Sequence, residues 1–406
     1  MAITNRVSLR SVMAGVTPIA DVPDAPTIGA AAATGETTAT VAYTAAITGG
    51  TATTFTATST PGSLTGTGAS PITVSGLTAS TSYTFKVKGT NATSVTGPES
   101  AASSSITTNA AVILGAYFAG GYNGSYNSNI DKIAFAADTK STLSDTLSAL
   151  AADGAGGANS GVAAYFVGGD NAGGVLSAID KVIFASDVKS TISATMSPGT
   201  FLPFAASNSG TALYFAGGWT SAPFTPRDTI DKLPFSTETR ARLSATLTDG
   251  RGSAGSAANS GTAAYFAGGY DGGQTSRIDK LAFSADTKST LAATLTSAAY
   301  NLTGAANSGT AAYFTGGSPG NLSRIDKITF SGDTKSTIAA TLTTGRHQPA
   351  GAANTGTAAY FAGGNDGGFI SGIDKITFSA DTKSTLSATL TSARQAVASA
   401  ANCGVF

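Results

Sequence analysis

The sequence predicts an all-β protein in which a β-sandwich is followed by a six-bladed β-propeller. Three observations support this. A Tyr-Phe pair recurs at intervals of about 49 residues, which is a period of repeat architectures. Each repeat holds short strand-like segments bracketed by turn-forming residues, and residues 23–110 have a different composition. The pairs begin at Tyr117, Tyr165, Tyr214, Tyr265, Tyr313 and Tyr360.

Composition limits the possible functions. The 406 residues carry a formal net charge of zero, and 11% of them are charged. Binding to nucleic acid or to an anionic membrane needs a clustered basic face, so we expect neither partner. One cysteine, Cys403, excludes an internal disulfide or a cysteine-based metal cluster. The apolar run at 110–121 is well short of the roughly 20 residues that span a membrane.

The N-terminal part divides into an arm and a module. Residues 1–22 have no continuous apolar core, so we expect a docking arm on a particle rather than a signal peptide. Residues 23–110 contain "PDAPTI", the alternating "TATVAYT" and "SGLTASTSYTFKVKGTN" followed by "GPES". This part resembles a fibronectin type III module, in which Leu77 and Tyr83 match the tyrosine corner. Tyr43 stands where that family usually has a core tryptophan.

Residues 111–406 contain the six repeats. In each one, "TAAYFAGG", "IDKITF", "STLSATLT" and "GAANSG", or close variants, follow one another. The aliphatic residues four apart in the third segment would also suit a short helix, but threonine content and flanking turns favour strands. Four strands in each of six repeats predict six blades. The segment of small residues is expected to be innermost, where the blades crowd around the axis.

The order of "aYFAGG", "IDKxxF", a turn and "TL" resembles the kelch repeat over residues 111–406. The sequence departs from that family because Leu, Ile or Thr replaces the tryptophan expected after the third strand. The "SADTKST" turns are similar to the Asp-box of sialidases, with Lys in place of its Gly. We interpret the aspartate as a hydrogen-bond acceptor within its own turn.

The two faces of the predicted disc differ in sequence variation. On one face the turns are monotonous, and a ring of cations is interpreted as a solvated rim, with docking of a neighbouring subunit as the alternative. These cations are Lys140, Lys189, Lys288, Lys335, Lys383 and, in sixth place, Arg240. On the other face the loops after the Gly pair, 122–129, 170–178, 219–229, 270–277, 318–324 and 365–372, and the inter-blade loops change from repeat to repeat. Variation confined to one face of a repeat protein is typical of a binding face.

The variable loops supply the candidate ligand-binding residues. Aromatic rings stack on sugar rings, and neighbouring polar groups can bind hydroxyls, so carbohydrate is the ligand we expect. The alternative is that the aromatic rings plug the wide end of the disc. The candidates are Trp219, Phe224, Tyr122, Tyr126, Tyr270, Phe369, Tyr300, Arg251, Arg346 and His347, with Phe201 beside them.

Catalysis is not expected, and neither is a cofactor. A kelch-like copper oxidase would need more histidines than His347 and a usable cysteine. Sialidase-like hydrolysis would need three converging arginines, for which Arg251, Arg346 and Arg394 are available without a recognisable pattern. No metal is predicted, although "YDGGQ" and "NDGG" leave a weak calcium site open.

These observations predict a non-enzymatic bacteriophage virion protein, made in the host cytoplasm. The abundance of Ala, Gly, Ser and Thr, the repeats and the spacer resemble tail-fibre, tail-associated or capsid-decorating proteins. The arm and fibronectin-like module would bind other virion proteins, copies would form a homo-oligomer, and the propeller would bind a host-surface glycan or protein. The alternatives are a bacterial surface adhesin and a virion-associated glycan hydrolase.

Closure of the ring is predicted from an offset in the repeat. The first copy lacks a preceding "GAANSG" segment, whereas the last copy is followed by "ASAANCG". We therefore expect the C-terminal segment to pair beside 115–121 and to complete the first blade, with Cys403 on the inner strand.

Overall fold

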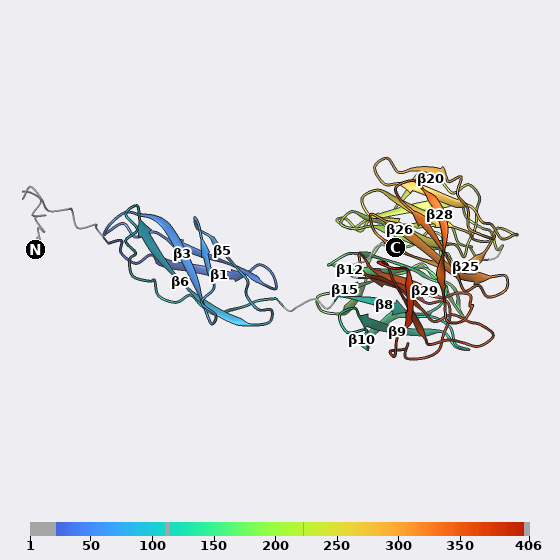
Figure 1. The fold of residues 1–406 in the computed structure, drawn as a ribbon, viewed down its shortest axis with the longest axis horizontal. Coiled ribbons are helices and arrows are strands. Elements are labelled where there is room, and N and C mark those ends of the chain that lie inside the picture. The colour runs from blue at the N-terminus through green and yellow to red at the C-terminus, as the bar shows by residue number, and fades with distance from the viewer. Residues whose placement is uncertain (1–21, 110–113, 222, 402–406) are drawn as a thin grey trace, which may run out of the picture. The chain divides into compact units, whose positions relative to one another are not determined.

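The computed structural model describes residues 22–109, 114–221 and 223–401, and it is all β (Figure 1). The chain divides into two compact units, Met1–Ala111 and Val112–Phe406. Residues 1–21 of the predicted arm and Cys403 lie outside the described residues. No helix in the described ranges is long and apolar enough to cross a membrane.

The first unit is a sandwich of two antiparallel sheets. One sheet has the order β1-β2-β5 and the other β4-β3-β6-β7. The strands are β1 (Thr27–Ala33), β2 (Thr38–Thr44), β3 (Ala52–Thr60), β4 (Thr65–Thr67), β5 (Ile72–Ser75), β6 (Ser82–Asn91) and β7 (Ile106–Thr107).

Alternating side chains of both sheets form the core of the sandwich. Val41, Val74 and Phe85 are fully buried within it. The hydroxyl of Tyr83 accepts a hydrogen bond of 2.9 Å from the backbone N–H of Thr78, which is the geometry of a tyrosine corner. The structure therefore shows a two-sheet sandwich with this corner, while the narrower likeness to a fibronectin type III module stays a prediction.

The second unit contains six four-stranded antiparallel sheets in the described residues, numbered here in chain order. Sheet 1 is β33 (Ala398–Ala401), β8 (Gly115–Ala119), β9 (Asn127–Ala134) and β10 (Thr139–Ala151). Sheet 2 is β11 (Ala155–Asn159), β12 (Ala163–Val167), β15 (Ile179–Ile183) and β16 (Val188–Thr191), and a small hairpin, β13 (Asp170–Asn171) and β14 (Gly174–Val175), follows β12. Sheet 3 is β17 (Phe204–Asn208), β18 (Ala212–Ala216), β19 (Thr229–Pro234) and β20 (Ala241–Thr246).

The remaining sheets repeat this order. Sheet 4 is β21 (Gly255–Asn259), β22 (Ala263–Ala267), β23 (Ile278–Ala282) and β24 (Thr287–Thr290). Sheet 5 is β25 (Tyr300–Asn307), β26 (Ala311–Ser318), β27 (Arg324–Thr329) and β28 (Thr334–Thr341). Sheet 6 is β29 (Ala350–Asn354), β30 (Ala358–Ala362), β31 (Ile373–Thr377) and β32 (Thr382–Thr385).

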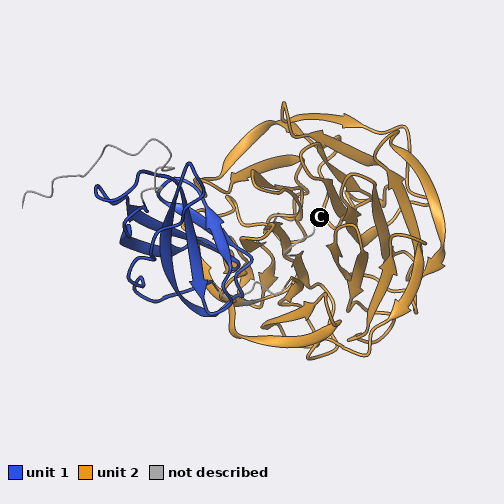
Figure 2. Cartoon of the chain, turned by 60° about the vertical axis from the view of Figure 1, so that its left-hand side comes forward, with its two compact units in different colours: residues 1–111 blue, residues 112–406 orange. Residues whose placement is uncertain are grey.

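The six sheets form a closed, β-propeller-like ring. The innermost strands β33, β11, β17, β21, β25 and β29 each contact the next, and β29 contacts β33 again. Figure 2 shows these sheets arranged around a central axis. Small side chains allow this crowding: a Cβ atom added to Gly304 would lie 2.2 Å from the carbonyl oxygen of Ser256 on the neighbouring inner strand.

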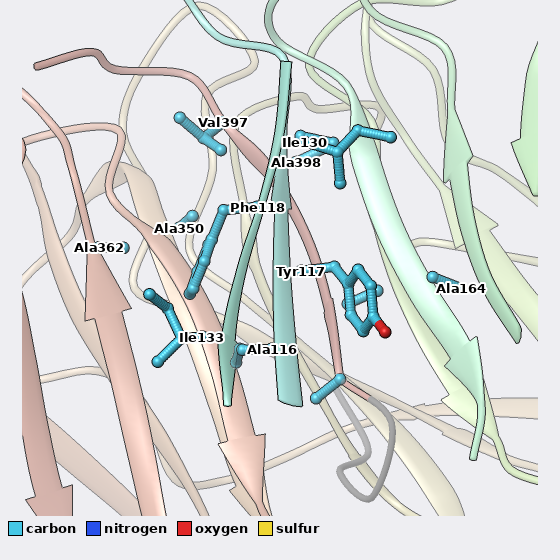
Figure 3. Close-up of a cluster of buried hydrophobic side chains, with 14 of the residues drawn as sticks. Ala116, Tyr117, Phe118, Ile130, Ile133, Ala164, Ala350, Ala362, Val397 and Ala398 are labelled. Atoms are coloured by element: carbon cyan, nitrogen blue, oxygen red, sulfur yellow. The ribbon is translucent and has the colours of Figure 1, made fainter. Parts of the chain in front are cut away.

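Both ends of the second unit contribute to sheet 1. Strand β33 pairs antiparallel with β8, with Ala398 opposite Ala119 and Ala401 opposite Ala116. This is the pairing that the repeat offset predicts. On β8, Tyr117 lies toward Ala164 of sheet 2, whereas Phe118 lies toward Ala350 of sheet 6 (Figure 3). The added strand therefore completes a sheet that packs against both of its neighbours.

A three-residue contact joins each sheet to the next, and we call it the clasp. A lysine and a tyrosine of one sheet both bind an acidic side chain in the third turn of the following sheet. The lysine–carboxylate distances are 2.5–2.8 Å, and the tyrosine hydroxyl donates a bond of 2.6–2.9 Å. Each lysine Nζ also lies 5.1–5.7 Å from the centre of the same tyrosine ring.

The clasps correct the prediction that the turn aspartate accepts bonds within its own turn. The acids bound from the preceding sheet are Asp138, Asp187, Glu238, Asp286, Asp333 and Asp381. Their backbone is left-handed, with φ of 49–56°. This conformation favours short acidic or amide side chains. The acidic residue of the third turn thus links its sheet to the preceding one.

The predicted solvated rim of cations is only partly exposed, and each cation pairs with an aspartate. Lys288 lies 3.7 Å from Asp279 in its own sheet, and Lys335 lies 3.5 Å from Asp326. The same pairing holds for Lys140, Lys189 and Lys383, while Arg240 bonds Asp231 at 2.8 Å. Each of these cations thus lies beside the buried aspartate of the Ile-Asp-Lys segment in its own sheet.

Candidate functional site

Six backbone hydrogen bonds form a closed circle around the axis of the second unit. Each of six residues donates its N–H to the carbonyl of the equivalent residue in the neighbouring repeat, at 2.7–3.1 Å. All six have left-handed φ between 50° and 60°. We call them the axial ring: Asp153, Leu202, Ser253, Asn301, Gln348 and Ala396. Because the backbone makes the circle, all six side chains can differ, and they do.

The axial ring borders a cavity of about 100 Å³ on the axis. Its wall includes many small residues of the inner strands, such as Gly156, Ala205 and Gly351. Five of the six ring residues are half-buried, and Ala396 is buried. Asp153 and Asn301 are three residues apart in the order of the six-membered ring, so they lie on opposite sides of the axis.

Two further rings of residues surround the axial ring. The residue before each ring member pairs through its backbone with the residue after each Gly pair: Phe201 with Trp219, Gly252 with Tyr270, His347 with Asn365, Tyr122 with Gln395, Ala152 with Asp170 and Tyr300 with Ser318. The inter-blade loops and the loops after the Gly pairs therefore meet on one face, as the alternation of turns predicts.

The second glycine of each pair makes this meeting possible. Gly169 has a φ of 98°, and a Cβ atom there would lie 2.3 Å from the carbonyl oxygen of Ala152. A side chain would force the two loops apart. This close approach explains why the Gly pair is constant while the residues after it change.

The predicted aromatic residues form separate groups around the mouth of the cavity. The ring of Tyr270 lies 6.3 Å from that of Trp219 and 5.2 Å from that of Tyr300. The ring of Tyr122 lies 5.3 Å from that of Tyr126 and 6.0 Å from that of Phe369. These residues are half-buried except Phe369, so each group keeps exposed ring surface.

Phe224 lies at a more exposed position in the longest variable loop. Its side chain is 69% exposed, and its ring lies 5.9 Å from that of Phe201. The imidazole of His347 is half-buried and forms a 2.9 Å hydrogen bond through Nδ1 with Asn321 Oδ1. Burial lowers the pKa of His347, so the neutral form is favoured next to the axial ring.

Two predicted ligand-binding residues are corrected by the structure. Arg251 is fully buried and bonds Asp279 at 2.9 Å, and Arg346 bonds Asp374 at 3.0 Å. Arg394 is likewise buried against Asp131 at 3.0 Å. Each guanidinium joins the end of one repeat to the next sheet, so these three side chains do not converge on a ligand.

The acids of this region fall into two electrostatic classes. Burial opposes ionisation of Asp279, yet hydrogen bonds from Thr248 and the charge of Arg251 hold its pKa below its usual value. Asp153 behaves in the opposite way. Burial, followed by the charge of Asp170, raises the pKa of Asp153 to about 7 despite a 2.7 Å bond from Gln348. Neither Asp153 nor Asp170 has an ion-pair partner within the described ranges.

Unpaired oxygen atoms are concentrated near the axial ring. The Oδ1 atoms of Asn301 and Asp170 and the Oε1 atom of Gln395 are buried and accept no hydrogen bond. No group of three or more His, Cys, Asp or Glu side chains in the described part of the chain is placed to hold a metal ion. These oxygen atoms are acceptors without a donor, and a ligand group that carries hydrogen-bond donors would satisfy them.

The axial ring is the part of the site that sequence reasoning missed. Its members stand six residues before the recurring asparagine of "AANSG", as Asp153 does before Asn159 and Ser253 before Asn259. Aligning the repeats on that asparagine would have exposed the variable position. The variable loops were identified from the sequence, but the axis they surround was not.

Comparison with known proteins supports the fold alone. No protein-family model matches the chain. No curated protein matches it either. Among solved structures, the one titled "Structure of YjhT" matches with a TM-score of 0.53 and 13% identity, over 66% of this chain and 96% of the other.

Proposed function

We propose that this chain is a non-enzymatic carbohydrate-binding protein whose ligand binds at the mouth of the axial ring. The observation that carries the proposal is the contrast at this ring. Six equivalent positions share one backbone geometry and one hydrogen-bond pattern, and they carry six different side chains. A purely structural position would be expected to keep one chemical type, as the clasps keep tyrosine, lysine and an acid. Variation on a fixed scaffold is typical of recognition.

The aromatic groups support a sugar as the ligand. Trp219, Tyr270 and Tyr300 lie around one side of the mouth, and Tyr122, Tyr126 and Phe369 form a second group. Ring faces can pack on the apolar faces of sugars, and the nearby acceptor oxygens can bind hydroxyl groups. Phe224, Phe201 and His347 extend the same face, so a ligand longer than one sugar ring would reach them.

The non-enzymatic part of the proposal draws on the arginines. A sialidase-like hydrolase needs three arginines that converge on a substrate carboxylate. Arg251, Arg346 and Arg394 are instead each engaged by a different aspartate. A glycan hydrolase is therefore the weaker alternative.

The context we propose is a bacteriophage virion, as a tail-fibre, tail-associated or capsid-decorating protein made in the host cytoplasm. The fibronectin-like sandwich would act as a spacer, and together with residues 1–22 it would bind other virion proteins, with several copies in each particle. The composition in small residues and the sandwich unit before a binding unit support this context. A bacterial surface adhesin is the alternative. Particles assembled with a chain lacking residues 1–110 test it, since we expect this chain to be left out.

A glycan array probed with the full chain tests the binding function. We expect binding to a defined set of glycans and a loss of at least about tenfold in affinity for Trp219→Ala and Tyr270→Ala, equal to about 1.4 kcal/mol. The control is Tyr43→Ala, which removes an aromatic ring from the sandwich unit. Equal binding by wild type and both variants would show that these rings only plug the disc. Hydrolysis of a bound glycan would refute the non-enzymatic assignment.

A further inference from the structure

The lining of the axial cavity is rich in hydrogen-bond acceptors and contains one acidic side chain. Among its lining residues are Asp153, Ser253, Asn301 and Gln348, which supply oxygen atoms, and no lysine, arginine or histidine lines it. The three buried arginines that end the repeats are already engaged: Arg251 by Asp279, Arg346 by Asp374 and Arg394 by Asp131. His347 is held toward its neutral form. An anionic group would therefore meet repulsion at the axis.

Asp153 has no cationic partner among the described residues. The aspartates of the Ile-Asp-Lys segments are buried and each has a lysine or arginine partner, as Asp279 does. Asp153 lies beside a second acid, Asp170, and neither has an ion pair among the described residues. Two uncompensated carboxylates in a partly buried site oppose folding unless a proton or a cation joins them.

Across the axis from Asp153, the buried Oδ1 atom of Asn301 accepts no hydrogen bond. Ser253 occupies a ring position next to Asn301 and adds a hydroxyl. These three groups come from three different repeats and border one cavity of about 100 Å³. An ammonium group carries three N–H donors and one positive charge, which matches three acceptors that include one carboxylate.

We infer that the axial cavity binds a cationic amine, of the kind carried by an amino sugar, between Asp153 and Asn301. The inference rests on the proposed function, because it names the chemical class of the ligand at the same site. The aromatic groups would hold the sugar rings, and the cavity would hold the ammonium group. The site would therefore reject acidic sugars and would favour an amine over a hydroxyl or an acetylated amine at the same position.

Isothermal titration of the full chain with D-galactosamine, D-galactose and N-acetyl-D-galactosamine at pH 7 and low salt tests this inference. We expect galactosamine to bind at least about tenfold more tightly than the two neutral sugars. Added salt should weaken the binding of galactosamine, because it screens the attraction between the ammonium group and the carboxylate. Asp153→Asn keeps the shape of the side chain and should abolish the preference. Asp271→Asn is the matched control, because it removes the same charge from an exposed position in the Tyr270 loop.

The outcomes separate the two proposals. Equal affinity for galactosamine and galactose, or an Asp153→Asn variant that keeps the preference, overturns the amine site while glycan binding on the array still supports the proposed function. A separate titration with Ca²⁺ alone distinguishes an inorganic cation. A response to Ca²⁺ that Asp153→Asn removes, without any response to galactosamine, would also overturn the amine assignment. Thermal unfolding of both variants confirms that a loss of binding does not reflect a loss of fold.

Discussion

The second unit is held together differently on its two faces. On the face with the third turns of each sheet, side chains make the connections: tyrosine, lysine and an acid form the clasps. On the opposite face, six backbone N–H groups and six carbonyl groups make the connections. Where side chains carry the contact, their chemical type is kept: tyrosine and lysine recur, and the acid is an aspartate or Glu238. Where the backbone carries the contact, the side chains are free to vary and can take on binding.

The two kinds of contact also differ electrostatically. The clasp acids and the aspartates of the Ile-Asp-Lys segments are matched by cations, whereas Asp153 on the axial ring is not. Paired charges stabilise the fold near neutral pH, while an unpaired buried charge opposes it. The unpaired Asp153 therefore lowers the stability of the folded protein, and a bound cationic ligand would restore it.

The largest effect is expected from a deletion that removes an inner strand together with one member of the axial ring. Removing residues 395–406 takes away β33, which pairs with β8, and Ala396, which closes the axial ring. The edge of β8 would be left unpaired, and exposed edges favour aggregation. We expect the loss of cooperative unfolding in circular dichroism and aggregation in size-exclusion chromatography. Unfolding at the same temperature as the full chain would contradict the closure.

A smaller but still large effect is expected from one buried ion pair. Asp279→Ala leaves the fully buried Arg251 without its counter-charge and should lower the free energy of unfolding by about 3–5 kcal/mol. Chemical denaturation measures this change. The control is Asp249→Asn, which breaks the partly exposed pair with Arg277 and should cost at most about 1 kcal/mol. Equal losses for both variants would refute the structural role of the buried pair.

Asp153→Asn should act in the opposite direction and depend on pH. The pKa of Asp153 is raised in the folded state, so the folded protein binds more protons than the unfolded chain between pH about 4 and about 7. Stability from this group is thus present at low pH and is lost as pH rises through that window. The variant should be more stable than wild type by about 1–3 kcal/mol at pH 8 and nearly equal at pH 4. A constant difference across this range in denaturation curves would argue against the raised pKa.

The smallest effect is expected at another position of the same ring. Ser253→Ala keeps the backbone N–H and carbonyl that form the axial ring, so the free energy of unfolding should change by no more than about 0.5 kcal/mol. The same variant should reduce galactosamine binding if its hydroxyl contacts the amine. A loss of several kcal/mol on chemical denaturation would show that the ring depends on side chains after all, and the contrast between the two faces would fail.

The sequence by itself determined the repeat, its four strands and the face on which its loops vary. The period of Tyr-Phe pairs and the Gly pairs carry this information, because close packing of equivalent strands permits few residue types. The C-terminal pairing also followed from sequence, since one repeat lacked its inner segment at the start and another segment remained at the end. The aromatic candidates Trp219, Tyr270 and Tyr122 were chosen in the same way, and the structure places them around the axial mouth.

Only the tertiary structure decided what the charged residues do. Arg251 and Lys288 stand in variable and constant segments of the sequence respectively, yet both end on the same carboxylate of Asp279. Such pairing joins residues from different repeats or strands, and no local pattern encodes which partner a charge will meet. The same holds for Asp153, Asn301 and Ser253, which are far apart in the chain and share one cavity because the ring closes. Local periodicity encodes the blades, whereas the site arises from their closure around an axis.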